Sequence, residues 1–228
     1  QKFSNKYNIK KELINFNSKI SMDAEIYNQI FNTEDKLIME NNYNSGSYYR
    51  FFPMFSIGAE TPFKMQKTLP QFTINPKVQM IVTPGISNSN KISNEDSTNN
   101  NFTIQNIYRL NRFSGSDKMD NSKRVTYGVN AYTNHLKTSL SQYYEFTNNS
   151  NYHKEQQNDD KLSDLLGSVQ YLKDNELSYN FRYDMNDSYL KQQSANFKTD
   201  NQYGEFNVSY LDQNSIVNNI ITKDNETI

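Results

Sequence analysis

The chain has 228 residues, a formal net charge of −1 at pH 7 and no cysteine. The balanced charge gives no reason to expect nucleic acid as a partner, and a chain without thiols holds neither a disulfide framework nor a thiolate metal site. Only 35% of the residues are hydrophobic, yet there are 17 Tyr and 14 Phe. Disordered chains are poor in aromatic residues, so this composition favours an outer-membrane barrel, whose strands have one apolar and one polar face.

The apolar runs and the ends of the chain limit the membrane topology. No apolar run approaches the roughly 20 residues that a membrane-spanning helix requires, and the longest is FFPMF at residues 51–55. A helical membrane protein is therefore excluded. The first residues show no signal peptide, and the last residues, IITKDNETI, read as the beginning of another strand. We expect residues 1–228 to be one partial barrel domain that is cut at both ends.

Alternation of apolar and polar residues predicts antiparallel strands along the chain. A first strand is predicted over 14–26, with Ile14, Phe16 and Ile20 on one face. Further strands are predicted around 78–82, 125–131, 140–146, 177–185 and 206–210. A tilted membrane strand needs about 9 to 11 residues. The predicted fold is therefore all-β, an antiparallel transmembrane barrel segment of about eight to ten strands that belongs to a larger barrel.

The predicted connectors alternate in length. Short polar turns are expected at YTNHLK, LKDNE and KTDNQ, where Asn and Asp tolerate the backbone angles of a hairpin. Long polar loops are expected near 86–109 and 147–162. Short turns at one rim and long loops at the other are typical of the periplasmic and extracellular ends of an outer-membrane barrel.

The segment LNRFSGSDKMDNSKRVTYGVN, residues 110–130, gathers Arg, Ser, Asp and Lys around Gly115 before a strand. Neighbours in sequence do not build a catalytic triad, and no Gly-x-Ser-x-Gly elbow precedes a helix. Seven scattered glycines form no phosphate-binding loop. We therefore predict no catalytic residue and no cofactor.

Candidate metal ligands are equally weak. His135 lies in a predicted short turn and His153 in a long loop, and neither has a partner at a metal-ligand spacing. The runs NED at 94–96 and NDD at 158–160 offer oxygen ligands for a divalent cation, but they lack the spacing of a calcium loop. We interpret both runs as solvated loop charge and predict no metal site.

One strand offers candidate lumen-facing residues. Between 177 and 185, the apolar face carries Leu177, Tyr179 and Phe181. The opposite face carries Ser178, Asn180, Arg182 and Asp184. If the apolar face meets lipid, these four side chains point into a hydrated lumen. The alternative is that they form the solvated face of an ordinary antiparallel sheet.

Four blocks carry a resemblance to a known family: NPKVQMIVTPG (75–85), NEDS (94–97), LNRFSGSDKMDNSKRVTYGVNAYT (110–133) and SLSQYYEF (139–146). Together they resemble the middle part of the C-terminal barrel domain of LptD proteins, most closely those of alphaproteobacteria. The family's motif is matched by Asn111, Arg112, Phe113, Ser114, Gly115 and Asp117, whereas Lys118 stands where the family usually has Arg.

The resemblance implies a role in lipopolysaccharide (LPS) assembly in the outer membrane of a Gram-negative bacterium. It implies a barrel wall that helps to insert LPS into the outer leaflet, an LptE-like lipoprotein in the lumen, and an LptA-like periplasmic bridge reached through a jelly-roll domain outside this chain. The connection at 32–47 is short for the family, which indicates a missing or reduced hairpin.

The place of the motif, after the long connector and before a strand, puts it at the long-loop rim, where we predict that it folds over or into the barrel mouth. There Gly115 is expected to permit the turn, Phe113 to anchor the loop and Arg112 to contact Asp117.

Two alternatives remain open from the residues alone. One is another outer-membrane barrel, such as a porin or receptor, and the other is a soluble β-sandwich that binds a ligand through its long loops.

Overall fold

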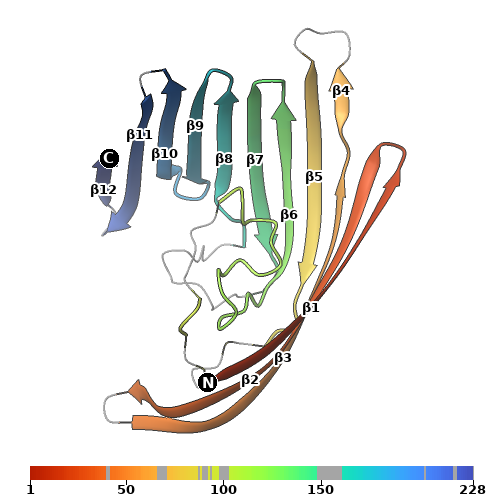
Figure 1. Ribbon diagram of the computed structural model, residues 1–228, viewed down its shortest axis with the longest axis vertical. Helices are drawn as coiled ribbons and strands as arrows, with labels where there is room; N and C mark the ends of the chain where they lie inside the picture. Colours follow the sequence, from red (N-terminus) through yellow and green to blue (C-terminus); the bar gives the residue numbers. More distant parts are fainter. Residues whose placement is uncertain are drawn as a thin grey trace.

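The computed structural model describes residues 1–39, 42–65, 71–86, 88, 92, 94–97, 103–147, 161–202, 204–217 and 220–227. Within these residues the regular structure is a single twelve-stranded antiparallel sheet (Figure 1). No helix in the described part of the chain is long and apolar enough to cross a membrane.

The strands follow one another along the sheet in nearly the order of the sequence, and the short β4 lies off this path and pairs with β5. They are β1 (Lys2–Asn15), β2 (Ser18–Met39), β3 (Asn42–Glu60), β4 (Phe63–Met65), β5 (Phe72–Val82), β6 (Lys123–Tyr132), β7 (Leu136–Glu145), β8 (Leu165–Leu172), β9 (Asn175–Asp184), β10 (Tyr189–Asn201), β11 (Gly204–Val217) and β12 (Ile220–Thr227). The predicted all-β antiparallel fold is confirmed, and the strand count exceeds the expected eight to ten. These strands form one sheet rather than the two packed layers of a sandwich.

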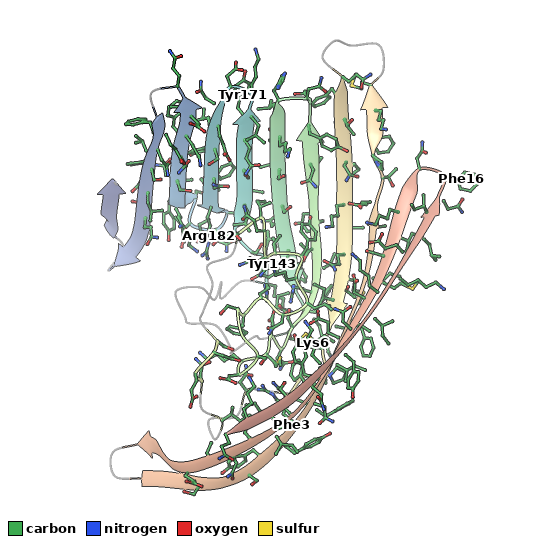
Figure 2. All side chains as sticks on the ribbon, viewed as in Figure 1. Phe3, Lys6, Phe16, Tyr143, Tyr171 and Arg182 are labelled. Atoms are coloured by element: carbon green, nitrogen blue, oxygen red, sulfur yellow. The ribbon has the colours of Figure 1, made fainter. Side chains whose placement is uncertain are left out.

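The strand predicted over 14–26 is wrong, because a hairpin turn divides it. Phe16 and Asn17 have φ of 47° and 61°, as the two central residues of a type I′ turn require. The register pairs Leu13 with Ile20, so Ile14 lies on the face opposite to Ile20. Figure 2 shows Phe16 at the tip of this hairpin, where its side chain is 93% exposed.

The described residues of the segment 32–47 belong to the paired ends of β2 and β3, with register shifts between Thr33 and Lys36 and between Leu37 and Met39. The described residues of this segment therefore lengthen two strands, and a missing or reduced hairpin relative to the family stays a prediction.

The connector from β5 to β6, residues 83–122, includes both the predicted loop near 86–109 and the motif at 111–117. Its described residues pack against one face of the sheet, at the ends of β6 and β7 that lie opposite their short turn (Figure 1). Two apolar clusters hold it there. Leu110 and Met119 pack with Phe52 and Ile81 in the first cluster. In the second, Ile107 and Phe113 pack with Tyr143 and Leu166. Most of the other predicted loop, at 147–162, lies outside the described residues.

The two faces of the sheet differ in chemistry. On the first, which we call the apolar face, cross-strand pairing aligns a row of exposed large hydrophobic side chains. The row runs across the sheet through Phe3, Tyr7, Phe55, Ile57, Val78, Met80, Tyr127, Leu140, Tyr171, Leu177, Phe206 and Val208. The other, which we call the polar face, carries charged, amide and hydroxyl side chains, together with apolar side chains such as Phe52, Met54 and Ile81 where the described residues of the 83–122 loop cover it.

Candidate functional site: the polar face and its loop

Tyr108 brings the loop into direct contact with the centre of the polar face. Its hydroxyl lies 3.1 Å from Oγ of Ser141, and Nζ of Lys77 lies 4.0 Å from its ring centroid. The hydroxyl oxygen lies against Gly128, where a Cβ atom would collide with Ser141 Oγ, the carbonyl of Leu140 and Tyr108 Oη. Burial raises the pKa of Tyr108, so the hydroxyl stays protonated. Gly128 thus matters because both β7 and the loop approach it closely.

The motif supplies a buried ionic cluster, which we call the loop base and define as Arg112, Asp120 and Arg124. Arg112 donates to both carboxylate oxygens of Asp120, at 2.5 and 3.1 Å, and Arg124 donates to Asp120 Oδ2 at 2.9 Å. The side chains of all three are at most 1% exposed. The Arg112 guanidinium also lies 4.7 Å from the ring centroid of Tyr143. One carboxylate therefore joins the loop to β6.

The expected contact of Arg112 with Asp117 is wrong, since Asp120 is the partner of Arg112. Asp117 lies in a second group, which we call the loop tip and define as residues 94–97 and 115–117. Asp117 Oδ2 accepts the N–H groups of Glu95 and Asp96 at 2.9 and 3.0 Å. In return, Asp96 Oδ1 accepts the N–H groups of Ser116 and Asp117 at 3.0 and 2.7 Å. These four bonds brace the two halves of the tip against each other.

Glycine is required at position 115 because there is no room for a side chain, and not because of an unusual backbone angle. A Cβ atom at this position would overlap the carbonyl group of Asp96, so glycine allows the two halves of the tip to meet. The remaining motif residues keep the shape of the loop: Asn111 Nδ2 donates to the carbonyl of Gly115 at 3.1 Å, Asn111 Oδ1 accepts the N–H of Asp120 at 3.1 Å, Phe113 is buried and Ser114 is exposed.

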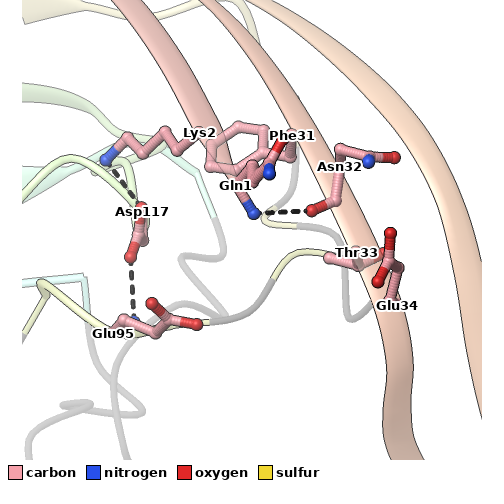
Figure 3. Close-up of a pocket in the computed structure, with 8 residues that line it drawn as sticks. All are labelled: Gln1, Lys2, Phe31, Asn32, Thr33, Glu34, Glu95 and Asp117. Atoms are coloured by element: carbon pink, nitrogen blue, oxygen red, sulfur yellow. Dashed lines mark hydrogen bonds and ion pairs between the residues drawn. The ribbon is translucent and has the colours of Figure 1, made fainter.

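Two cations from the first three strands bind the tip. Lys2 Nζ donates to Asp96 at 2.7 Å, to Ser116 Oγ at 2.6 Å and to Asp117 at 2.7 Å, and Figure 3 shows the last of these bonds. Arg50 donates to the carbonyls of Ser116 and Asp117 at 2.5 and 2.6 Å. The sequence pattern did not single out Lys2, Arg50 or Asp120, because it does not tell which distant charges meet.

The electrostatics of the tip are dominated by Asp96. Burial alone would raise the pKa of its carboxyl group, but the hydrogen bonds from Lys2, Ser97 and the N–H groups of Asp117 and Ser116 outweigh that effect. They hold the pKa of Asp96 well below its usual range. The carboxylate therefore remains charged at any pH near neutral.

The four predicted residues of β9 lie along one strand. Arg182 donates to Asp164, and Lys191 Nζ contacts Asp164 at 3.2 Å and Asp184 at 2.5 Å. Ser178 stands opposite Gln170 and Asn196 in the neighbouring strands. Asn180 and Arg182 border a cavity of about 140 Å³ together with Thr103, Ile104 and Gln105 of the loop. Figure 2 labels Arg182 near the loop end of the sheet.

The other candidates do not assemble into a site in the described part of the chain. Nδ1 of His135 lies 3.2 Å from the carbonyl of Leu172, in the short-turn region. The acidic run at 94–96 belongs to the loop tip, whereas His153 and the run at 158–160 lie outside the described residues. Among the described residues, no three His, Cys, Asp or Glu side chains are grouped so that they could hold a metal ion.

A family model described as "LptD: LPS transport system D" matches residues 3–227. Comparison with curated proteins finds no match.

Proposed function

The chain belongs to the LptD family, the LPS transport system D proteins, and from this premise we propose that its sheet is a section of barrel wall. The family transports and assembles LPS in the outer membrane and is not a family of enzymes. The section proposed here would be the middle of the wall, facing lipid on one side and the lumen on the other.

The observation that carries this proposal is the contrast between the two faces of one continuous sheet. Phe55, Ile57 and Val78 leave 43 to 52% of their side chains exposed on the apolar face, a surface that is unfavourable in water and suited to lipid acyl chains. Lys77, Gln79 and Ser141 lie on the polar face. Such a wall separates the acyl chains of LPS from its hydrophilic sugar, which requires no bond to be made or broken.

The edges of the sheet support a larger barrel. β1 and β12 lie at its two ends, and in the described residues they pair only with β2 and β11. Unpaired backbone N–H and C=O groups cost several kcal/mol each in hydrocarbon. We propose that strands from outside these 228 residues complete the barrel, so that this chain is one part of the barrel domain.

The partners follow from family membership. An LptE-like lipoprotein in the lumen would contact the polar face, and an LptA-like bridge would deliver LPS through a jelly-roll domain outside this chain. The four β9 residues Ser178, Asn180, Arg182 and Asp184 would then face the lumen, because Asn180 and Arg182 border the same cavity as the loop.

Depletion of the parent protein in its own bacterium tests the proposal. LPS should accumulate in the inner-membrane or periplasmic fraction and should return to the surface when the gene is supplied again. Depletion of an unrelated outer-membrane barrel provides the control. Normal surface delivery of LPS after depletion would contradict the proposal, and a loss of solute uptake instead would favour a porin or receptor.

A further inference from the structure

The loop tip and the loop base are attached to the sheet in different ways. The base is an ionic cluster with side chains at most 1% exposed, flanked by the apolar contacts of Leu110 and Met119. The tip is held by Arg50, which is buried, and by Lys2, which pairs with the buried Asp117 and with Asp96; the side chains of Lys2 and Asp96 are 26 and 41% exposed, so this part of the attachment is open to solvent. Exposed ion pairs are weaker than buried ones and are screened by salt, so the two attachments differ in how readily they open.

The tip is a unit in itself. Asp117 and Asp96 each accept two backbone N–H groups from the opposite half of the tip. Four charge-assisted hydrogen bonds of this kind keep 94–97 and 115–117 together. The tip can therefore leave the sheet without losing its own internal bonds.

The contacts between the tip and the first three strands are few and specific. The Lys2 ammonium group has three N–H donors, and it donates one hydrogen bond each to Asp96, Ser116 and Asp117. Arg50 reaches two carbonyls of the tip and also bonds Gln29, whose Nε2 donates to the carbonyl of Ser116 at 3.2 Å. Beneath these contacts Gln29 is 0% and Phe31 4% exposed, so the tip covers part of the polar face of β2.

A cavity already separates the tip from the end of the β1–β2 hairpin. Its volume is about 340 Å³, and its lining includes Phe31, Thr33 and Glu34 on one side and Glu95 and Asp117 on the other (Figure 3). The tip is thus joined to the strands on one side of this space by the Lys2 and Arg50 contacts.

We infer that the loop tip is a strap that Lys2 and Arg50 fasten over the polar face of β1–β3, and that it opens about the loop base when these contacts are broken. Opening uncovers Gln29, Phe31 and Arg50 while the Arg112–Asp120–Arg124 cluster stays in place. The device controls how much of the polar face is accessible, whatever ligand uses that face.

Two spin labels in the intact protein in a lipid bilayer would measure the strap. The chain has no cysteine, so Asn5→Cys on β1 and Ser114→Cys beside the tip add the only thiols within it; both positions are exposed. The wild-type background should give mainly one short distance. Lys2→Met should raise the ratio of long to short distances about tenfold, the change expected when hydrogen bonds to a charged group are lost.

Lys6→Met is the matched control, because Lys6 lies on the same face of β1 and pairs with Glu25 at 3.0 Å; its distances should match wild type. Raising salt from about 0.05 to about 0.5 M should favour the long distance in wild type, since screening weakens exposed ion pairs. This titration needs no variant to fold. A single short distance in Lys2→Met and at high salt would overturn the inference, even if LPS transport itself were confirmed.

Discussion

The two faces of the sheet are formed by the same strands, but the side chains of one face are exposed and many of those of the other are covered by the loop. On the apolar face, Val78 and Tyr127 stand opposite each other and remain 43 and 40% exposed. On the polar face, a residue away on each strand, Lys77 and Gly128 lie under Tyr108 of the loop. The difference shows that alternation of apolar and polar residues gives one sheet two chemically different faces. The loop then covers part of the polar face and leaves the apolar face exposed.

The largest expected effect lies where the loop covers the polar face. Asp120→Asn removes the buried carboxylate that Arg112 and Arg124 share, which should lower the free energy of unfolding by about 3–5 kcal/mol. Urea unfolding in lipid vesicles would measure it. Glu25→Gln, which removes a more exposed charge from the same face, should change stability by less than about 1 kcal/mol. Equal effects of the two substitutions would show that covering by the loop does not make the charges of the polar face more important for stability.

Neighbouring residues of β6 compare the two faces directly. Val129 lies on the apolar face and Asn130 on the polar face. Val129→Arg should destabilise the barrel in the membrane by about 2–4 kcal/mol if it sits near the bilayer midplane, because it places a charge in lipid. Asn130→Arg should be tolerated. Outer-membrane assembly and unfolding in vesicles would measure both, and equal tolerance would show that the apolar face does not meet lipid.

A smaller effect is expected from the contact of the loop with the sheet. Gly128→Ala adds a Cβ atom that collides with Tyr108 and Ser141, and overpacking of this kind costs about 1–3 kcal/mol. The measurement is the unfolding midpoint together with proteolysis of the 103–122 loop. Ser139→Ala, nearer the short turn on the same face, is the control. Unchanged protection of the loop in Gly128→Ala would mean that Tyr108 does not depend on this glycine.

The smallest expected effect is a weaker attachment of the loop tip at low pH. The pKa of Asp96 is lowered in the folded state, so its stabilisation is fully present above the unfolded pKa of about 4 and is lost as the pH falls through the lower folded pKa. Attachment of the tip should therefore be constant from about pH 5 to 8 and weaken below about pH 4. The spin-label distances report this step. Asp96→Asn should abolish it, and a step of equal size in that variant would assign it to another group.

Much of the architecture was predictable because it depends on local alternation. The segment 177–185 alternates without interruption, and it forms β9 with only Met185 lying beyond the strand end. The turn at 16–17 was missed because Ile14 and Phe16 extend the even-numbered apolar pattern of β2 backwards, although a two-residue turn moves the apolar face to odd-numbered residues in β1. The pairing of Leu13 with Ile20 then exchanges the faces of the residues before it.

By itself the sequence determined the antiparallel all-β class, the two-faced strands, the place of the long loop and, through the motif around Gly115, the resemblance to the LptD family. These features depend on period-two patterns and short motifs, which are properties of neighbouring residues. Only the tertiary structure decided that Asp120 pairs with Arg112, and that Asp117 binds Lys2, which lies 115 residues away. A carboxylate selects its partner by distance and burial, and both are set by how the loop packs on the sheet.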